Sequence, residues 1–305
     1  MRIHLIVSLA ALAAGCGSGR MPPGGGGQWT FGDFAAPPSG DFAAPPFPGD
    51  DAGAPDDCSD AARLVYVIDA SGKLSSFAPE KLLFTDIGTV QCGDEPPGSV
   101  NSMAIDRNAV AWINFQSGNV YKVNVQSPHL DCQATAFAPD PFGGFSTFGM
   151  GYSTNTAGAS DETLFIAGSD GLAGNALARL DTATMKPKAV GALDSWPELT
   201  GTGDARLWGF FPAESGTRVA EIDKTTAKLG MTYTLPQLNG TQTAWAFAFW
   251  GGDFWIFLKR DKDNSTNVWH LAIFDGGTSV TEAVHDTGRE IVGAGVSTCA
   301  PLTIG

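Results

Sequence analysis

Three aspartates occupy matching places in this sequence, and carboxylates gathered around one axis could bind a cation or orient a sugar or an amine. Asp106, Asp204 and Asp253 each follow a run of small residues and precede a run of apolar, strand-forming residues. Arg107 and Arg206 stand beside two of them and could neutralise their charge through salt bridges. In the alternative interpretation, each aspartate only caps a tight turn with its own side chain. The sequence leaves both interpretations open.

No catalytic motif accompanies these candidate binding residues. Residues 144–148 lack the second glycine of a nucleophile elbow. Residues 293–295 start like a dinucleotide fingerprint but lack its third glycine. His129, His270 and His285 do not have the spacing of a zinc site. We therefore expect no catalytic residue, no metal and no cofactor.

Cys16 is a candidate for covalent lipid attachment. Arg2 provides a positive charge, and residues 5–14 form an apolar run. This run is shorter than the ~20 residues that a helix needs to span a bilayer. The run 12–16 resembles the lipobox of bacterial lipoproteins, in which a signal peptidase cuts before the cysteine and the thiol receives a diacylglycerol. The resemblance implies a signal peptide at residues 1–15 and acyl chains, such as palmitate, that anchor Cys16 in a membrane. In such lipoproteins, Asp directly after the cysteine retains the protein in the inner membrane, and this chain has Gly17 there. The resemblance therefore implies that the protein is anchored in the outer membrane, where it faces either the periplasm or the cell surface.

The residues after Cys16 have the composition of a linker. Residues 16–57 are rich in Pro and Gly and poor in Leu, Ile and Val, and the segment 32–38 is nearly repeated at 40–46. Such a chain buries too little apolar surface to offset the entropy of ordering. The sequence therefore predicts a lipidated, disordered tether at 16–57 and a folded domain at 58–305.

The charge of the chain excludes one class of partner. It carries 18 Lys and Arg against 32 Asp and Glu, for a net charge of −14. An acidic domain is repelled by phosphate, so we expect no nucleic-acid partner. A protein or a glycan is the expected ligand.

A repeat organises the folded domain. An apolar strand with an aromatic residue recurs every 43 to 53 residues, which is the spacing of four-stranded propeller blades. The aromatic markers are Tyr66, Trp112, Phe165, Trp208 and Trp255. The sequence thus predicts an all-β fold, a β-propeller of five four-stranded blades. An irregular β-sandwich is the rival fold.

The ends of the chain are expected to close the ring. A strand of small residues precedes every marker except the first, and small side chains suit the crowded axis of a propeller. The missing strand is found at 291–297, near the C-terminus. The C-terminal strand should therefore complete the first blade.

The remaining cysteines indicate two disulfides. Cys58, Cys92, Cys132 and Cys299 are an even set in an exported chain, which permits three pairings. Ring closure favours Cys58–Cys299, because the strands that these cysteines flank lack the connecting hairpin of the other blades. Cys92 and Cys132 then pair by elimination. Cys92 ends one outer strand and Cys132 begins another, which by itself would place them on opposite faces of the ring.

Several segments are similar to a known group of sequences. Residues 148–151, 199–207, 244–253 and 291–299 resemble an uncharacterised family of predicted lipoproteins from myxobacteria. The resemblance implies a secreted, propeller-like domain and no known activity. The sequence as a whole favours a membrane-anchored, extracytoplasmic module that binds or scaffolds without catalysis. The alternative function is a propeller-type hydrolase or lyase that uses the aspartates at the channel mouth.

Overall fold

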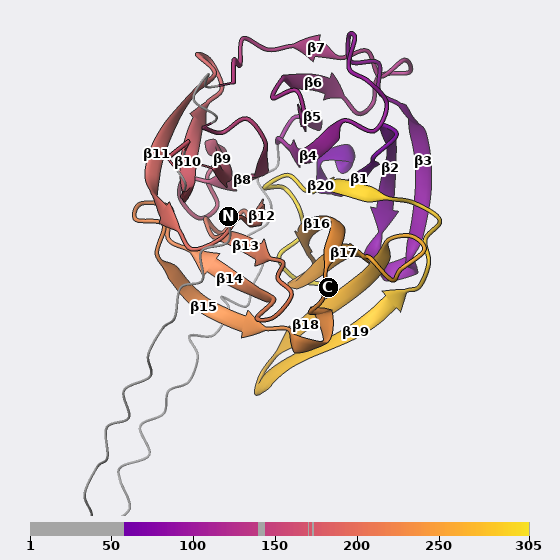
Figure 1. Ribbon diagram of the computed structural model, residues 1–305, viewed down its shortest axis with the longest axis vertical. Coiled ribbons are helices and arrows are strands. Elements are labelled where there is room, and N and C mark those ends of the chain that lie inside the picture. The colour runs from indigo at the N-terminus through magenta and orange to yellow at the C-terminus, as the bar shows by residue number, and fades with distance from the viewer. Residues whose placement is uncertain (1–57, 140–143, 170, 173, 305) are drawn as a thin grey trace, which may run out of the picture. The chain divides into compact units, whose positions relative to one another are not determined.

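The computed structural model describes residues 58–139, 144–169, 171–172 and 174–304. Within these residues the chain forms five four-stranded antiparallel sheets arranged in a ring, which is a five-bladed β-propeller (Figure 1). This confirms the fold class predicted from the repeat. Cys16 and the tether lie outside the described residues. No helix in the described part of the chain is long and apolar enough to span a membrane.

The strand order is the same in every blade, with the inner strand next to the axis. Blade 1 consists of β20 (Ile291–Gly295), β1 (Val65–Asp69), β2 (Lys73–Ala78) and β3 (Leu83–Thr89). Blade 2 consists of β4 (Val100–Ile105), β5 (Val110–Phe115), β6 (Val120–Asn124) and β7 (Gln133–Ala134). Blade 3 consists of β8 (Phe148–Thr154), β9 (Glu162–Ser169), β10 (Asn175–Asp181) and β11 (Lys186–Leu193).

The last two blades follow the same plan. Blade 4 consists of β12 (Glu198–Gly201), β13 (Leu207–Phe211), β14 (Arg218–Ile222) and β15 (Leu229–Thr234). Blade 5 consists of β16 (Gln242–Trp250), β17 (Asp253–Arg260), β18 (Asn267–Phe274) and β19 (Gly277–Val284). The described residues also form three short 3-10 turns, one before β1 at Asp60–Arg63 and two between strands at Pro79–Lys81 and Pro236–Leu238. Each marker aromatic lies on the second strand of its blade, as the repeat predicts.

Small residues on the inner strands let neighbouring blades approach closely. A Cβ atom on Gly149 of β8 would lie 2.2 Å from the backbone oxygen of Pro197, beside β12. A Cβ atom on Gly201 of β12 would lie 2.1 Å from the backbone oxygen of Tyr152. These distances are too short for any side chain, so the small-residue pattern in the sequence reflects crowding at the axis.

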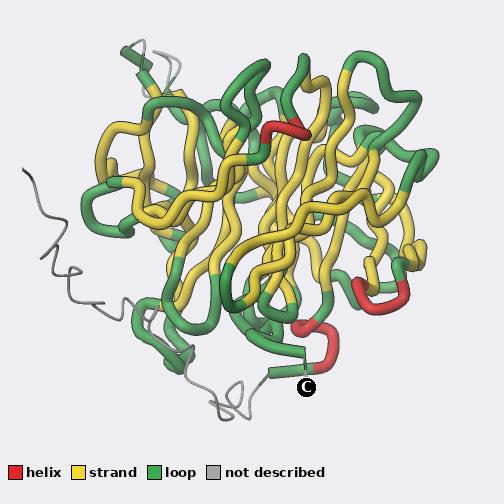
Figure 2. The backbone as a smooth tube through the Cα atoms, turned by 90° about the horizontal axis from the view of Figure 1, so that it is seen from below, coloured by secondary structure: helices red, strands yellow, loops and turns green. Residues whose placement is uncertain are grey.

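Apolar side chains between adjacent sheets form the core. Between blades 1 and 5, for example, Phe77 packs edge-on against Trp255 and Phe257, with ring centroids 5.5 Å apart in both pairs. A side view shows the sheets standing close together, with loops at both ends of the strands (Figure 2). The hydrophobic effect thus acts between blades, since each blade buries its faces only against its neighbours.

The ring closes as the sequence predicts. β20 pairs antiparallel with β1, with Val67 opposite Ala294, so strands from the two ends of the domain share one sheet (Figure 1). Cys58 and Cys299 form a disulfide beside this junction, with their Cα atoms 5.9 Å apart.

The second disulfide, Cys92–Cys132, links blades 1 and 2, and its Cα atoms are 4.7 Å apart. The chains beside it form a short parallel bridge between Gln91 and Asp131. In this bridge the Gln91 N–H donates to the Leu130 oxygen at 3.0 Å, and the Cys132 N–H donates to the Gln91 oxygen at 3.0 Å. The bridge brings the segments that carry Cys92 and Cys132 side by side. The two cysteines can therefore pair, although one follows an outer strand and the other precedes one. Both predicted disulfides are confirmed.

Candidate functional site

The three predicted aspartates all lie where an inner strand passes to the second strand of its blade. We call this end of the ring the closure side, because β20 ends there next to the Cys58–Cys299 disulfide. Asp106 follows β4, Asp204 follows β12 and Asp253 follows β16. Their shared position on one side agrees with the repeat.

Each of these carboxylates accepts hydrogen bonds from its own blade. Asp106 Oδ1 accepts the N–H groups of Asn108 at 2.9 Å and Val110 at 3.0 Å, and its Oδ2 accepts the indole N–H of Trp112 at 3.1 Å. Asp204 accepts the hydroxyl of Thr202.

Asp253 is held in the same way within blade 5. It lies 2.8 Å from His270 Nε2 and accepts the Ile273 N–H at 2.9 Å. Among the described residues, no group of three His, Cys, Asp or Glu side chains is placed to hold a metal ion. The contacts of all three aspartates are those of turn and strand caps, and a binding role for them stays a prediction.

The two predicted arginines have partners in different places. Arg206 forms two hydrogen bonds with Glu221 of β14, at 3.0 and 3.1 Å, and its guanidinium lies over the Trp208 ring at 4.5 Å from the centroid. Burial acts to lower the pKa of Arg206, but the hydrogen bonds and charge of Glu221 raise it, and the more distant charge of Asp204 adds to that rise. Arg107 crosses towards blade 1, where it donates to Thr298 Oγ1 at 3.2 Å and to Cys58 Sγ at 3.4 Å.

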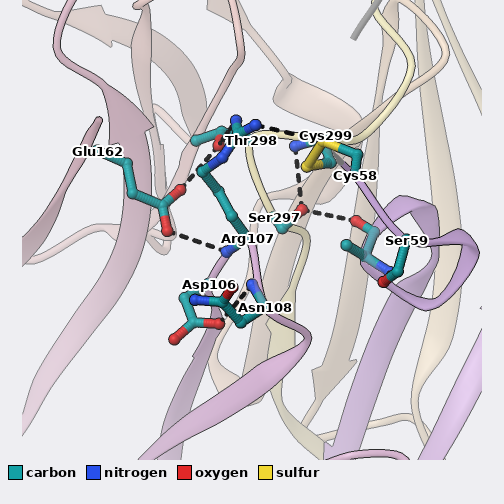
Figure 3. Close-up of a disulfide and its surroundings, with 10 residues drawn as sticks. Cys58, Ser59, Asp106, Arg107, Asn108, Glu162, Ser297, Thr298 and Cys299 are labelled. Atoms are coloured by element: carbon teal, nitrogen blue, oxygen red, sulfur yellow. Dashed lines mark hydrogen bonds between the residues drawn. A yellow bond between two sulfur atoms is a disulfide. The ribbon is translucent and has the colours of Figure 1, made fainter. Parts of the chain in front are cut away.

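A half-buried carboxyl joins three blades at the closure side (Figure 3). Glu162 of β9 accepts the backbone N–H of Arg107 at 2.9 Å and the hydroxyl of Thr298 at 2.7 Å. Burial raises the pKa of Glu162 to about 7, although both hydrogen bonds act to lower it. These contacts connect blades 1, 2 and 3 beside the disulfide.

The opposite end of the ring contains a cavity of about 110 Å³, which we call the mouth cavity. Residues at the first or second position of all five inner strands line it, so it lies on the axis. The polar and aromatic side chains that line it are Asn101, Gln116, Trp196, Glu198, Thr243 and Trp245. Both tryptophans are half-buried, and Gln116 and Thr243 are exposed.

Glu198 is the one charged side chain among the described residues that line the mouth cavity. It opens β12 and is only 3% exposed. Its Oε1 accepts the Ser102 hydroxyl at 2.5 Å and the Met150 N–H at 3.3 Å. Burial raises the pKa of Glu198 to about 8, against the opposite effect of its hydrogen bonds from Ser102, Met150 and Leu199. Burial therefore favours the protonated form of this carboxyl in the unliganded protein.

A network of amides fixes the wall beside this carboxyl. Asn101 donates to Asn114 Oδ1 at 2.9 Å and to the Phe148 oxygen at 3.0 Å. Gln116 donates to Asn101 Oδ1 at 3.2 Å. Asn114 is fully buried. Because each amide is held by another, these polar groups are oriented before any ligand arrives.

Sequence reasoning missed the mouth cavity. The available signal was Glu198 itself, a charged residue at the start of an otherwise small and apolar inner strand. A charge in a position that the repeat places at the axis is unusual, since ionised side chains are rarely fully buried without a partner.

The comparisons with known proteins identify no family. No family model matches the chain, and no curated protein matches it. Among solved structures, it is similar to a putative oxidoreductase (glucose dehydrogenase) from Thermus thermophilus, with 11% identity, a TM-score of 0.42, and coverage of 74% of this chain and 82% of that chain. It is also similar to TolB from Acinetobacter baumannii, with 10% identity, a TM-score of 0.41, and coverage of 72% of this chain and 52% of that chain. The chain thus spans about half of that TolB chain, and similarities at this level carry no argument about function.

Proposed function

We propose that this chain is a non-catalytic binding or scaffold module, anchored through Cys16 to the bacterial outer membrane, and that its ligand enters the mouth cavity. The observation that carries the proposal is the make-up of that cavity. Two half-buried indoles and a set of fixed amides surround a buried carboxyl. Binding sites commonly combine an apolar wall with a few oriented polar groups in a concavity.

The extracytoplasmic address rests on separate observations. The lipobox at Cys16 and the tether that follows it support lipid anchoring. Two disulfides support an oxidising compartment, because such bonds persist there and are rare in the cytosol. The net charge of −14 disfavours nucleic acids, which leaves a protein or a glycan as the expected partner.

A ligand screen with two tryptophan variants tests the binding role. Thermal shifts of the full mature chain are measured against a panel of glycans, peptides and small polar molecules, for wild type and Trp245→Ala. Trp269→Ala is the matched control, because Trp269 is half-buried and packs against the same core cluster as Trp245 but does not line the cavity. A ligand whose shift is lost in Trp245→Ala and kept in Trp269→Ala supports the proposal. A panel that shifts neither wild type nor variants contradicts it.

A hydrolase or lyase is the second candidate, and one observation favours it. Glu198 has a pKa near 8 at the wall of a cavity, which is a property of general acids. Acid–base chemistry at a glycosidic bond normally needs a second carboxylate, and the described residues of the cavity wall offer none. Turnover in a glycosidase or lyase panel that disappears in Glu198→Gln would establish the enzyme and overturn the binding role.

A further inference from the structure

From the mouth cavity we infer that this propeller binds a small organic ammonium ion, held between the Glu198 carboxylate and the indoles of Trp196 and Trp245. This inference rests on the proposed function and specifies its ligand class. It uses three properties of the cavity, which are its volume, its charge and the chemistry of its wall.

The volume limits the size of the group that enters. The cavity measures about 110 Å³. This is less than the roughly 150 Å³ of an apolar protein cavity that holds one benzene molecule. A head group of about four or five heavy atoms fits such a space, whereas a whole sugar ring with its hydroxyls does not. Any larger ligand must therefore present a small end group to the cavity.

The carboxyl in the cavity determines the sign of the charge that the ligand carries. Glu198 is buried, and hydrogen bonds from Ser102 and Met150 hold its carboxyl in place. No Lys, Arg or His contributes to its pKa, and none lines the described cavity wall. A buried carboxyl without a counter-charge is costly to ionise, and a cationic ligand would supply the missing charge. Once ionised, the same group would repel an anion.

The wall favours an organic cation over a metal ion. Divalent cations take several oxygen or nitrogen ligands, and the described residues contain no group of three metal-ligating side chains. The wall instead presents Trp196 and Trp245, and tryptophan is the strongest of the aromatic residues in attracting ammonium ions. One carboxylate with two indoles is a combination that suits a methylated or primary ammonium group.

The inference is tested by isothermal titration of the full mature chain with choline and with its uncharged isostere, 3,3-dimethyl-1-butanol. Choline should bind, and the isostere should bind at least about 10-fold more weakly, because only choline carries the charge. Choline affinity should rise at least about 10-fold between pH 6 and pH 8, because the ionised fraction of Glu198, whose pKa burial raises to about 8, grows over this range. Parallel titrations with phosphatidylcholine vesicles distinguish a free amine from a lipid head group, and binding of either supports the ammonium assignment.

Two variants locate the binding. Glu198→Gln should lower choline affinity at least about 10-fold at pH 8 and abolish its pH dependence. Glu162→Gln is the matched control, because Glu162 is a half-buried carboxyl whose pKa is also raised but which lies on the closure side. The choline affinity of this variant should match that of wild type. Equal binding of choline and its isostere to wild type, or unchanged choline binding by Glu198→Gln, would overturn the inference. If choline fails while another ligand of the screen binds in a Trp245-dependent manner, the inference is wrong and the proposed binding function stands.

Discussion

Removing the Cys58–Cys299 disulfide should destabilise the propeller more than removing Cys92–Cys132. A disulfide restricts the unfolded chain, and the restriction grows with the length of the loop that it closes. The two bonds close loops with sequence separations of 241 and 40 residues. The loop-entropy relation then gives about 5 kcal/mol for the first bond and about 4 kcal/mol for the second.

The two pairs form a matched comparison. Each joins one buried cysteine, Cys299 or Cys92, to one half-buried cysteine, so Ala substitutions create similar packing losses. The Cys58→Ala/Cys299→Ala variant also removes the sulfur that Arg107 contacts and frees the end of the chain that carries β20. Its cost should therefore exceed that of the Cys92→Ala/Cys132→Ala variant by at least about 1 kcal/mol.

Urea unfolding under non-reducing conditions measures both double variants against wild type, and hydrogen exchange reports on β20. We expect faster exchange at the β20 amides in the Cys58→Ala/Cys299→Ala variant and unchanged exchange there in the other. Equal losses of unfolding free energy, with β20 equally protected in both variants, would refute the view that this disulfide secures the closure of the ring.

Three further predictions concern single residues. Cys16→Ala should move the protein from the detergent phase to the aqueous phase in a partition assay, and unchanged partitioning would argue against lipid anchoring. Wild type should lose stability relative to Glu198→Gln as the pH rises from about 4.5 to about 8. Over this range Glu198 ionises in the unfolded chain, whereas burial keeps it protonated in the folded chain. The difference in unfolding free energy should reach a few kcal/mol, measured by thermal or urea unfolding. An effect in the opposite direction would contradict the burial of that carboxyl. Asp106→Ala should lower the free energy of unfolding by about 1 kcal/mol, because it removes an acceptor of three hydrogen bonds, and it should leave ligand affinity unchanged. A loss of ligand affinity would instead support the predicted binding role of the closure-side carboxylates.

The strand repeat could be read from the sequence because its causes are local. Turn residues and alternating apolar residues mark each strand, and the aromatic marker recurs at a blade-length spacing. The displaced inner strand at 291–297 and its flanking cysteines, Cys58 and Cys299, then predicted closure and the first disulfide, and Cys92–Cys132 followed by elimination. In each case the residues required for the prediction lie within or directly beside the strands concerned.

The chemistry at the axis could not be predicted in this way. The sequence repeat places Asp106, Asp204 and Asp253 at equivalent positions, but their oxygens accept hydrogen bonds from nearby groups in their own blades. Equivalent positions in a repeat do not establish that side chains point at one another. The direction of a side chain depends on the partners that packing provides.

The sequence by itself predicted the export signal and the tether, and it determined the number of blades and the way in which the ring closes, because each of these depends on composition or on periodicity along the chain. Only the tertiary structure showed the mouth cavity, where we propose that a ligand binds. Ser102 and Glu198 are 96 positions apart and come from non-adjacent blades, yet they share a hydrogen bond across the axis. The burial that raises the pKa of Glu198, and the cavity beside it, arise when all five inner strands meet, and no single segment of the sequence contains them.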